Sequence, residues 1–509
     1  MPSLRLSRDQ GTRELLMLAR LIKPVLLACA VFVTVWVLVI VYWQYTARMP
    51  STSDIVLYLV VLPLALMLFY GVLRRILTAA PSAAAAPAVG ATVAAGAGAP
   101  SASNTAAPEA SQERLQMAVL AFGLRTPRGS DADTVATAVG QAQTPELVPE
   151  LRDGEGFPVI AGRVEGIDEN ELREHLRESL QPAGEALDVD ALPDDRLRAI
   201  HLMSDVLQEL LASAAEAIAN AGDALSVRAP GRFVSSGSVI PGPASAPQLN
   251  ISLLLPGAWS ENERVIATQW VQQRVREGDA SQRWHVDCFK SEDGVSGMAL
   301  LDRISLSLHR EQRPALWIAL AADSSVSEAR IARWESEGLL YSTARRNGRV
   351  PGEAAAGLLL ARGGDALLAP ADAVRLSRGA SGQREASADT ARTPDASLLD
   401  RFAQHLLATS ALETAQVDWV VSDADHRTSR VTEVAKLVQE RLPHVPFENN
   451  LSVCATLGHL GAAADMSAVA LACHLAARDA RHVLALSVQD AHARTALLAG
   501  PASPASPAT

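Results

Sequence analysis

Cysteine is scarce in this chain, with four residues among 509. Cys29 lies inside an apolar run, whereas Cys288, Cys454 and Cys473 are far apart, and no C-x-x-C pair is present. These spacings exclude a disulfide framework and a zinc site, and they are typical of a reducing compartment. We therefore expect no metal ion, and no motif in the sequence indicates a cofactor.

A net positive charge is lacking outside the N-terminal region. Residues 1–80 hold eight Lys or Arg and three acidic residues, a net charge of +5, whereas the whole chain carries −11. The remainder therefore carries −16, and such a surface repels phosphate backbones. No basic stripe interleaved with aromatic residues is present, so the sequence argues against nucleic-acid binding.

Two long apolar runs are present near the N-terminus. Residues 25–43 contain no charged residue, and residues 55–73 are interrupted only by Pro63 and Gly71. About 20 apolar residues in a helix span a hydrocarbon core. Residues 1–78 are therefore predicted to be a membrane anchor with two transmembrane helices, at about 25–43 and 55–73.

The charges around these runs predict the topology. Basic residues precede the first run and follow the second, which indicates that both ends lie in the cytoplasm. An Ala-rich, Arg-rich and Lys-poor composition is typical of a bacterium with a GC-rich genome. We expect a multi-pass protein of the bacterial inner membrane, with its soluble domain in the cytoplasm.

Low-complexity segments border the soluble region. Residues 79–112 are almost wholly Ala, Pro, Gly, Ser and Thr, and such a segment buries too little apolar surface to fold. We expect a disordered linker there. A disordered tail is predicted at 493–509, where the chain ends in PASPASPAT.

Between these segments, short apolar runs alternate with helical patterns. Residues 251–255 and 315–322 are continuous apolar runs that predict buried strands, and residues 197–219 have helical periodicity. Asp131 or Asp133 is a candidate N-cap for the helix that follows. Strands that are apolar on both faces and alternate with helices indicate an α/β fold whose sheets are covered on both sides.

Seven segments, taken in order, resemble the β-ketoacyl synthases of the thiolase fold. They are residues 117–139, 157–168, 194–214, 293–324, 348–361, 417–438 and 449–476. The resemblance implies a thiolase-like fold with two pseudo-symmetric α/β/α halves, preceded by the two transmembrane helices. It places the N-terminal half at 113–330 and the C-terminal half at 331–492, and it implies a homodimer.

The resemblance also locates the catalytic positions of the family, and most of them have changed. The nucleophilic cysteine of the family, at a helix start, falls on Gly294, and its first catalytic histidine falls on Asp423. Its lysine falls on Cys454, while its second histidine and its glutamate are retained as His459 and Glu353. Because glycine offers no nucleophile, the resemblance implies a degenerate condensing site.

Two further residues are candidate substitutes. Ser296 can in principle replace the nucleophile, although a serine in this position is more often a helix cap. His426 lies three residues after Asp423 and replaces the first histidine only if the turn is shifted. Asp423, Asp425 and His426 also suggest a metal cluster, but Arg427 beside them favours an ion-paired turn.

The remaining candidates have structural interpretations. His459 is best interpreted as a hydrogen-bonded structural histidine. A structural role is one possible interpretation of Glu353. Cys288 is best interpreted as a buried residue that packs like an apolar one. If the resemblance holds, Cys454 faces the family's active-site pocket. The sequence therefore leaves open the interpretation that Cys454 is a reactive thiol.

Two functions fit this pattern. The first is a membrane-anchored, catalytically inactive ketosynthase-like pseudoenzyme that acts as a scaffold, an adaptor or an acyl-group sensor. In outline it is similar to accessory proteins encoded beside type VI secretion effectors, which present a cargo protein for export. The alternative is an active acyltransferase or condensing enzyme that uses acyl carrier protein or coenzyme A thioesters. We expect the membrane, a second copy of the chain and an unidentified protein as partners.

Overall fold

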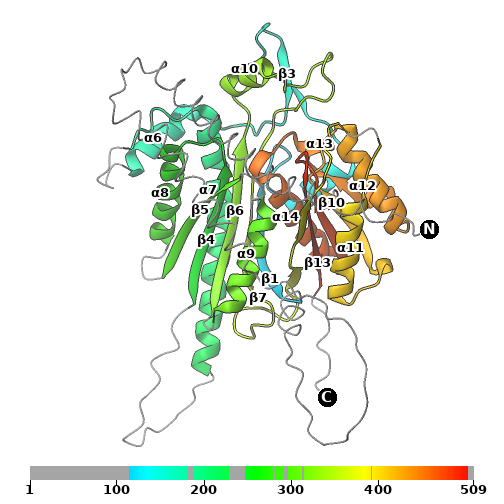
Figure 1. Ribbon diagram of the computed structural model, residues 1–509. Coiled ribbons are helices and arrows are strands. Elements are labelled where there is room, and N and C mark those ends of the chain that lie inside the picture. The colour runs from blue at the N-terminus through cyan, green and yellow to red at the C-terminus, as the bar shows by residue number, and fades with distance from the viewer. Residues whose placement is uncertain are drawn as a thin grey trace, which may run out of the picture. The chain divides into compact units, whose positions relative to one another are not determined.

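The computed structural model describes residues 114–180, 187–227, 247–278, 283–291, 296–311, 314–390 and 393–501, which belong to one compact unit (Figure 1). The predicted anchor at 1–78, with spans at about 25–43 and 55–73, lies outside these ranges, as do the predicted linker at 79–112 and Gly294. Among the helices of the described ranges, none is both long enough and apolar enough to cross a membrane. The transmembrane helices therefore stay a prediction from the sequence.

The described domain alternates strands and helices. Its strands are β1 (Gln116–Arg125), β2 (Glu146–Arg152), β3 (Pro158–Ala161), β4 (Gln248–Pro256), β5 (Trp284–Ser291), β6 (Ala315–Ser324), β7 (Glu353–Arg362), β8 (Val374–Ser377), β9 (Ala380–Gln383), β10 (Val417–Ser422), β11 (Asn450–Ser452), β12 (His482–Ser487) and β13 (Ala493–Gly500). Its α-helices are α5 (Ala132–Gly140), α6 (Glu169–Leu180), α7 (Asp194–Val227), α8 (Glu261–Gly278), α9 (Gly297–Arg310), α10 (Glu328–Ser336), α11 (Ser397–Ser410), α12 (Thr428–Arg441), α13 (Val453–Leu457) and α14 (Ala464–Asp479).

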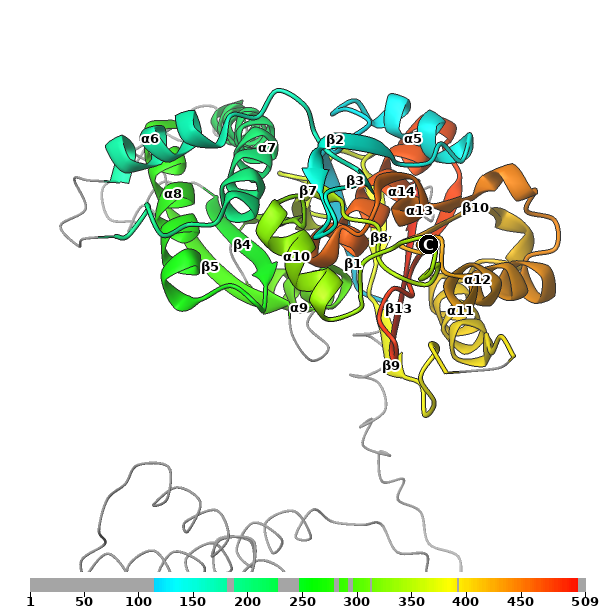
Figure 2. The ribbon, with the colours of Figure 1, turned by 90° about the horizontal axis from the view of Figure 1, so that it is seen from above.

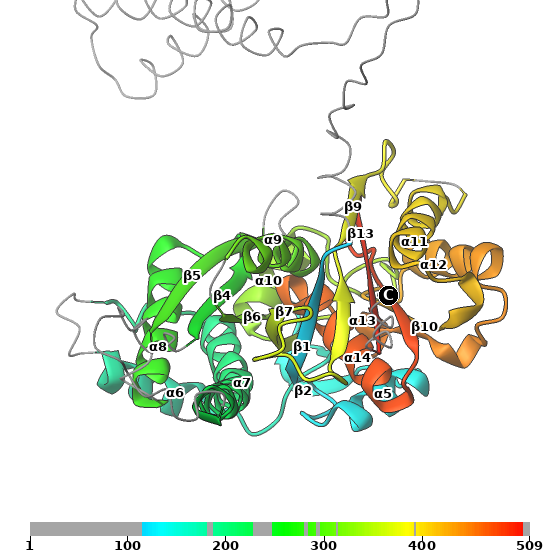
Figure 3. The same ribbon diagram turned by 90° about the horizontal axis from the view of Figure 1, so that it is seen from below.

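The strand order repeats along the chain. One mixed sheet has the order β11-β10-β12-β13-β8-β1-β7-β6-β4-β5. In both β5-β4-β6-β7-β1 and β11-β10-β12-β13-β8, the first three strands are parallel and the last two pairings are antiparallel. The two sets meet where β1 pairs with β8 (Figure 3). This repeat matches the predicted pair of pseudo-symmetric halves.

The boundary between the halves differs from the predicted one at 330/331. Strand β7 pairs with both β6 and β1, so it completes the first half, which extends to Arg362. The second half begins with β8 at Val374. The predicted boundary was too early because β7 pairs with β1, which is distant in the sequence, and local sequence patterns do not predict such a pairing.

Helices cover the sheet in an outer layer on each side and a central layer (Figure 2). Helices α7 and α8 pack on the first half, in a cluster that includes Leu207 and Leu320, and α11 and α12 pack on the second half. Central helices α9 and α14 bury residues such as Leu301 and Met466 against strands of both halves. Because helices lie on both of its faces, β7 is buried from Glu353 to Ala361, as its apolar run predicts.

The predicted disordered tail at 493–509 is wrong in its first part. Residues 493–500 form β13, which pairs with β12 on one side and with β8 and β9 on the other. Arg494 to Gly500 are buried there. The strand was missed because the short apolar run ALLAG directly precedes the Pro- and Ala-rich end and reads as part of it.

Candidate functional site

The start of α9 follows Gly294, the position onto which the resemblance places the family's nucleophile and which lies outside the described residues. Ser296 is the N-cap, and its hydroxyl accepts a hydrogen bond from the Ala299 N–H at 3.3 Å. The Ser296 side chain therefore serves the helix as a cap, which confirms the structural interpretation of this residue.

A carboxylate from the other half of the domain covers the same helix start. Asp465, in the first turn of α14, accepts from the Gly297 N–H at 3.0 Å and from the Met298 N–H at 2.9 Å. Burial raises the pKa of the Asp465 carboxyl. A Cβ atom at Gly297 would lie 2.6 Å from the Asp465 carboxylate, so a larger residue there would displace this carboxylate. Two N–H groups at the positive end of α9 are thus already bound by a carboxylate.

Asp423 is the residue onto which the resemblance places the family's first histidine, and its carboxylate binds the end of β12 and the loop that follows. Its carboxylate accepts from the Val488 N–H at 2.6 Å, the Gln489 N–H at 3.1 Å and the Ser487 hydroxyl at 2.7 Å. Burial raises the pKa of Asp423 to about 7, with the Asp465 carboxyl adding to the increase. The Asp423 side chain therefore connects the loop after β10 to the end of β12 and the loop that follows it.

Cys454 lies in α13 and is buried, with 1% of its surface exposed. Burial raises the pKa of its thiol well above the usual 9.0, and the carboxylates of Asp423 and Asp425 raise it further. A thiol in this environment stays protonated at neutral pH and is a poor nucleophile. The surroundings of Cys454 therefore argue against the reactive thiol that the sequence left open.

His459 is packed against an aromatic ring. Its ring lies edge-on to Trp334 with centroids 5.4 Å apart, and its backbone N–H donates to the Val350 carbonyl at 2.8 Å. The ring Nδ1 is buried and has no hydrogen-bond partner among the described residues, so the hydrogen bond expected for this imidazole is not found there. Burial lowers the pKa of His459 well below 6.5, and Arg349 and Arg427 lower it further. Gly458 before it has a φ of 85°, in the left-handed region that favours glycine. The Gly-His pair is thus explained by packing and backbone conformation.

His426 does not replace the first histidine. Its Nε2 atom lies 3.2 Å from the Arg346 carbonyl, and its ring packs edge-on to Tyr341. Asp425 instead binds the Arg427 guanidinium at 2.8 Å. These side chains point to separate partners, and no group of three or more His, Cys, Asp or Glu in the described ranges is arranged to hold a metal ion. The ion-paired turn favoured for this segment is confirmed.

Glu353 is retained for a structural reason. It is fully buried at the start of β7 and accepts from Arg198 Nε at 2.8 Å and Nη2 at 2.5 Å. The Ser324 hydroxyl and the Val164 N–H also donate to it, at 2.8 and 2.7 Å. Its carboxylate therefore joins α7, β6, β7 and the segment after β3, and it has no free oxygen lone pair aimed at a substrate.

Three important side chains were not singled out from the sequence. Besides Asp465 and Arg198, Asp323 at the end of β6 accepts from the Ala462 N–H at 3.2 Å, and burial raises its pKa to about 6. For Asp465, the sequence signal that could have identified it is its position as a lone carboxylate in the apolar segment GAAADMSAVALA. Such an isolated acid in a buried helix needs partners from elsewhere in the fold.

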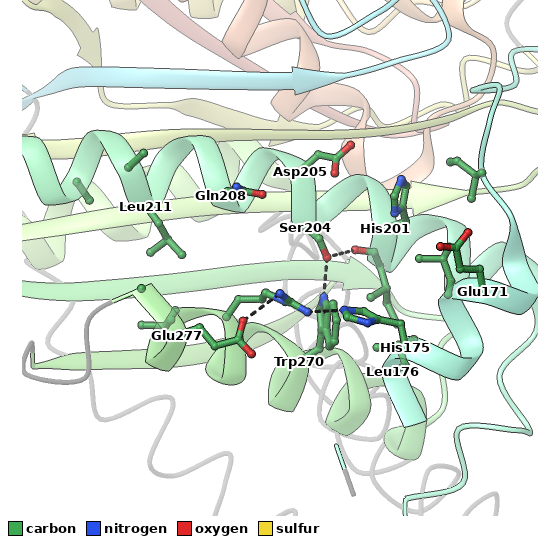
Figure 4. Close-up of a pocket in the computed structure, with 18 of the residues that line it drawn as sticks. Glu171, His175, Leu176, His201, Ser204, Asp205, Gln208, Leu211, Trp270 and Glu277 are labelled. Atoms are coloured by element: carbon green, nitrogen blue, oxygen red, sulfur yellow. Dashed lines mark hydrogen bonds and ion pairs between the residues drawn. The ribbon is translucent and has the colours of Figure 1, made fainter. Parts of the chain in front are cut away.

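An apolar cavity of about 760 Å³ lies apart from this site, between α6, α7 and α8 (Figure 4). Trp270 donates to the Ser204 hydroxyl at 2.6 Å, and the Arg274 guanidinium lies 4.1 Å from the centre of the Trp270 ring. Arg274 also contacts His175 Nε2 at 2.8 Å. None of the predicted site residues lines this cavity.

Three solved structures show what the domain is similar to. The oxazolomycin ketosynthase domain of Streptomyces albus JA3453 is 12% identical over 78% of this chain and 76% of its own, with a TM-score of 0.50. A β-ketoacyl synthase from Burkholderia phymatum STM815 is 14% identical over 76% of this chain and 100% of its own, with a TM-score of 0.49. The ketosynthase from module 6 of the Bacillus subtilis 168 bacillaene synthase is 12% identical over 76% of this chain and 72% of its own, also with 0.49.

Comparison with protein-family models gives no match, and comparison with curated proteins gives none either. The expected α/β, thiolase-like ketosynthase fold is confirmed by the first of the solved structures. At 12% identity the likeness concerns the fold alone.

The Asp423→Asn variant is expected to lose part of the pH dependence of folding. The folded state raises the pKa of Asp423 from 3.8 to about 7, so it holds a proton that the unfolded chain releases. This contribution makes the free energy of unfolding fall as the pH rises from about 4 to about 7, by at most about 1.4 kcal/mol per pH unit. Urea unfolding of a fragment of residues 102–509 at several pH values measures this slope.

The neutral His459 acts in the opposite direction, because a histidine with a lowered pKa loses stability as the pH falls below 6.5. The comparison is therefore between variants at the same pH. Substitution of the exposed Asp372 by Asn is the matched control and should leave the profile unchanged. A profile of Asp423→Asn that runs parallel to that of the unchanged fragment between pH 4 and 7 would contradict the assignment.

Proposed function

We propose that this chain is a membrane-anchored, catalytically inactive ketosynthase-like protein that acts as a scaffold or adaptor. The observation that carries the proposal is the contact between Asp465 and the start of α9. A condensing enzyme needs that helix start to stabilise charge at its nucleophile. Here a carboxylate from the same chain binds it, and the aligned nucleophile position is Gly294.

The other aligned positions support the same proposal. Asp423 and Glu353 have their oxygens committed to buried hydrogen bonds, and Cys454 is a buried thiol. Residues that act as a unit in catalysis do not compensate for each other when several are lost. The alternative, an acyltransferase or condensing enzyme, requires a substitute nucleophile such as Cys454, Cys288 or Ser296.

The remaining parts of the proposal come from the sequence. Two spans at about 25–43 and 55–73 would hold the domain on the cytoplasmic side of the bacterial inner membrane. A catalytically inactive domain that is tethered to the membrane would act by binding another protein, such as a cargo of type VI secretion. A homodimer is also proposed, because among the described strands β5 pairs with β4 alone and offers this edge of the sheet to a second copy.

Intact-mass measurement after incubation with acyl-coenzyme A or acyl carrier protein tests the proposal. We expect no covalent acyl adduct, because no thiolate is available at the start of α9 and the Cys454 thiol stays protonated. An active β-ketoacyl synthase treated in parallel is the positive control.

Three substitutions distinguish the alternative. If an adduct forms on the unchanged chain and disappears in Cys454→Ser, Cys288→Ser or Ser296→Ala, that residue is a substitute nucleophile. Such a result would overturn the pseudoenzyme proposal and favour the acyltransferase.

A further inference from the structure

A second cavity, of about 950 Å³, opens between the segment before β7, the segment before α11 and the start of α12. Five arginines line it, namely Arg345, Arg346, Arg349, Arg384 and Arg427. Asp389 and Asp395 are its only lining carboxylates within the described part of the chain. The wall therefore carries an excess of three positive charges, although the soluble part of the chain is acidic overall.

Three of these arginines form no direct ion pair among the described residues, although the carboxylates of Asp425, Asp389 and Glu337 attract Arg349 from a longer distance. Arg384 is held by Glu433 at 2.5 Å, and Arg427 is held by Asp425 at 2.8 Å. Asp389 lies 2.8 Å from Arg430. Among the described residues, no ion pair is formed by Arg345, Arg346 or Arg349. The excess charge thus belongs to one short segment, 345–349.

Like charges are crowded behind this segment. Burial lowers the pKa of the half-buried Arg349, and the neighbouring Arg427 lowers it further. Burial and Arg427 also lower the pKa of Arg430, whose side chain is fully buried behind the wall. The Nε atom of Arg384, a residue 6% exposed at its side chain, has no hydrogen-bond partner in the described structure. A bound anion would relieve this repulsion and satisfy these donors.

The first turn of α12 contributes further donors. Its N-cap is Arg427, and no side chain caps the helix. Thr428 and Ser429, whose N–H groups begin the 14-residue helix, line the cavity. An uncapped helix start has free N–H groups and a positive dipole end, both of which favour an anion.

The chemistry of the wall restricts the kind of anion. Hydroxyl side chains line it at Thr343, Thr393, Thr428, Ser429 and Thr432, whereas no aromatic side chain does. A nucleotide base would find no ring to stack on, but the oxygens of a compact anion would find guanidinium, hydroxyl and N–H donors. We propose that this arginine cavity binds a phosphate monoester dianion.

This proposal goes beyond a scaffold role and does not depend on the absence of condensation. The same headgroup chemistry has two sources, a soluble phosphate ester and a phosphatidic acid in the membrane. Glycerol 3-phosphate and dioctanoyl phosphatidic acid share the monoester group and are therefore the two probes. Dioctanoyl phosphatidylcholine, whose phosphate is a diester beside a cation, is the matched lipid control.

Calorimetric titration of the full-length chain in a non-ionic detergent tests the proposal. We expect binding of at least one phosphate monoester, weakened by salt, and no binding of phosphatidylcholine. The double variant R345Q/R349Q should bind about tenfold more weakly for each arginine removed. R345K/R349K keeps the charge and should recover part of the affinity. R481Q, which removes an exposed arginine elsewhere, should bind as the unchanged chain does.

The outcomes separate the sources. Binding of both probes indicates a soluble ester as a sufficient ligand, and binding of phosphatidic acid alone indicates a lipid headgroup. The proposal is overturned if neither probe binds the unchanged chain, or if R345Q/R349Q and R481Q bind equally well. Circular dichroism of each variant verifies that a loss of binding is not a loss of fold, which is expected because Arg345 is exposed.

Discussion

Replacement of Glu353 by alanine is expected to destabilise the domain by about 3–5 kcal/mol, the usual cost of removing one partner of a buried ion pair. The Arg198 guanidinium, 1% exposed, would keep its charge in the interior with Glu169 as its remaining acidic partner. The Val164 N–H and the Ser324 hydroxyl would also lose their acceptor. Because domains have a total stability of about 5–15 kcal/mol, this loss is large. Urea unfolding followed by circular dichroism measures it.

Glu169 supplies the matched control, since it binds the same guanidinium at 2.6 Å but is 26% exposed. Its replacement by alanine should cost about 1 kcal/mol or less. In a double-mutant cycle with Arg198→Met, the effects of the two single changes should be far from additive. Equal losses for Glu353→Ala and Glu169→Ala would show that burial does not set the strength of this network.

Replacement of Asp465 by alanine is expected to cost about 2–4 kcal/mol. The change leaves the Gly297 and Met298 N–H groups buried without an acceptor, and each unsatisfied group costs about 1–3 kcal/mol. It also removes a negative charge from the positive end of α9. The midpoint of urea unfolding of the 102–509 fragment should therefore fall well below that of the unchanged fragment.

The exposed cap of α5 is the matched control for this change. The Asp131 carboxylate accepts from the Thr134 N–H at 2.8 Å in solvent, so Asp131→Ala should destabilise the fragment far less than Asp465→Ala does. Asp465→Asn retains one acceptor oxygen and should lie between the two. Similar losses for Asp465→Ala and Asp131→Ala would contradict the buried cap and weaken the proposed function.

The sequence by itself predicted the α/β class, which the fold confirms. The positions aligned with the family's catalytic residues rest on the resemblance and stay a prediction. Continuous apolar runs such as 251–255 and 315–322 become β4 and β6, because strands covered on both faces need apolar side chains in both directions. The sequence offered Asp131 or Asp133 as the cap of α5, and in the structure the Asp131 carboxylate accepts from the Thr134 N–H three residues further on. The absence of a nucleophile at Gly294 is visible in the letters alone.

Only the tertiary structure decided what the remaining polar residues do. Asp465 reaches the start of α9 across 168 residues of sequence, and Arg198 reaches Glu353 across 155. Strand β13 and the true boundary between the halves also depend on strand pairings between distant segments. Local spacing predicts contacts within a few residues, whereas these partners are selected by the packing of one half of the sheet against the other.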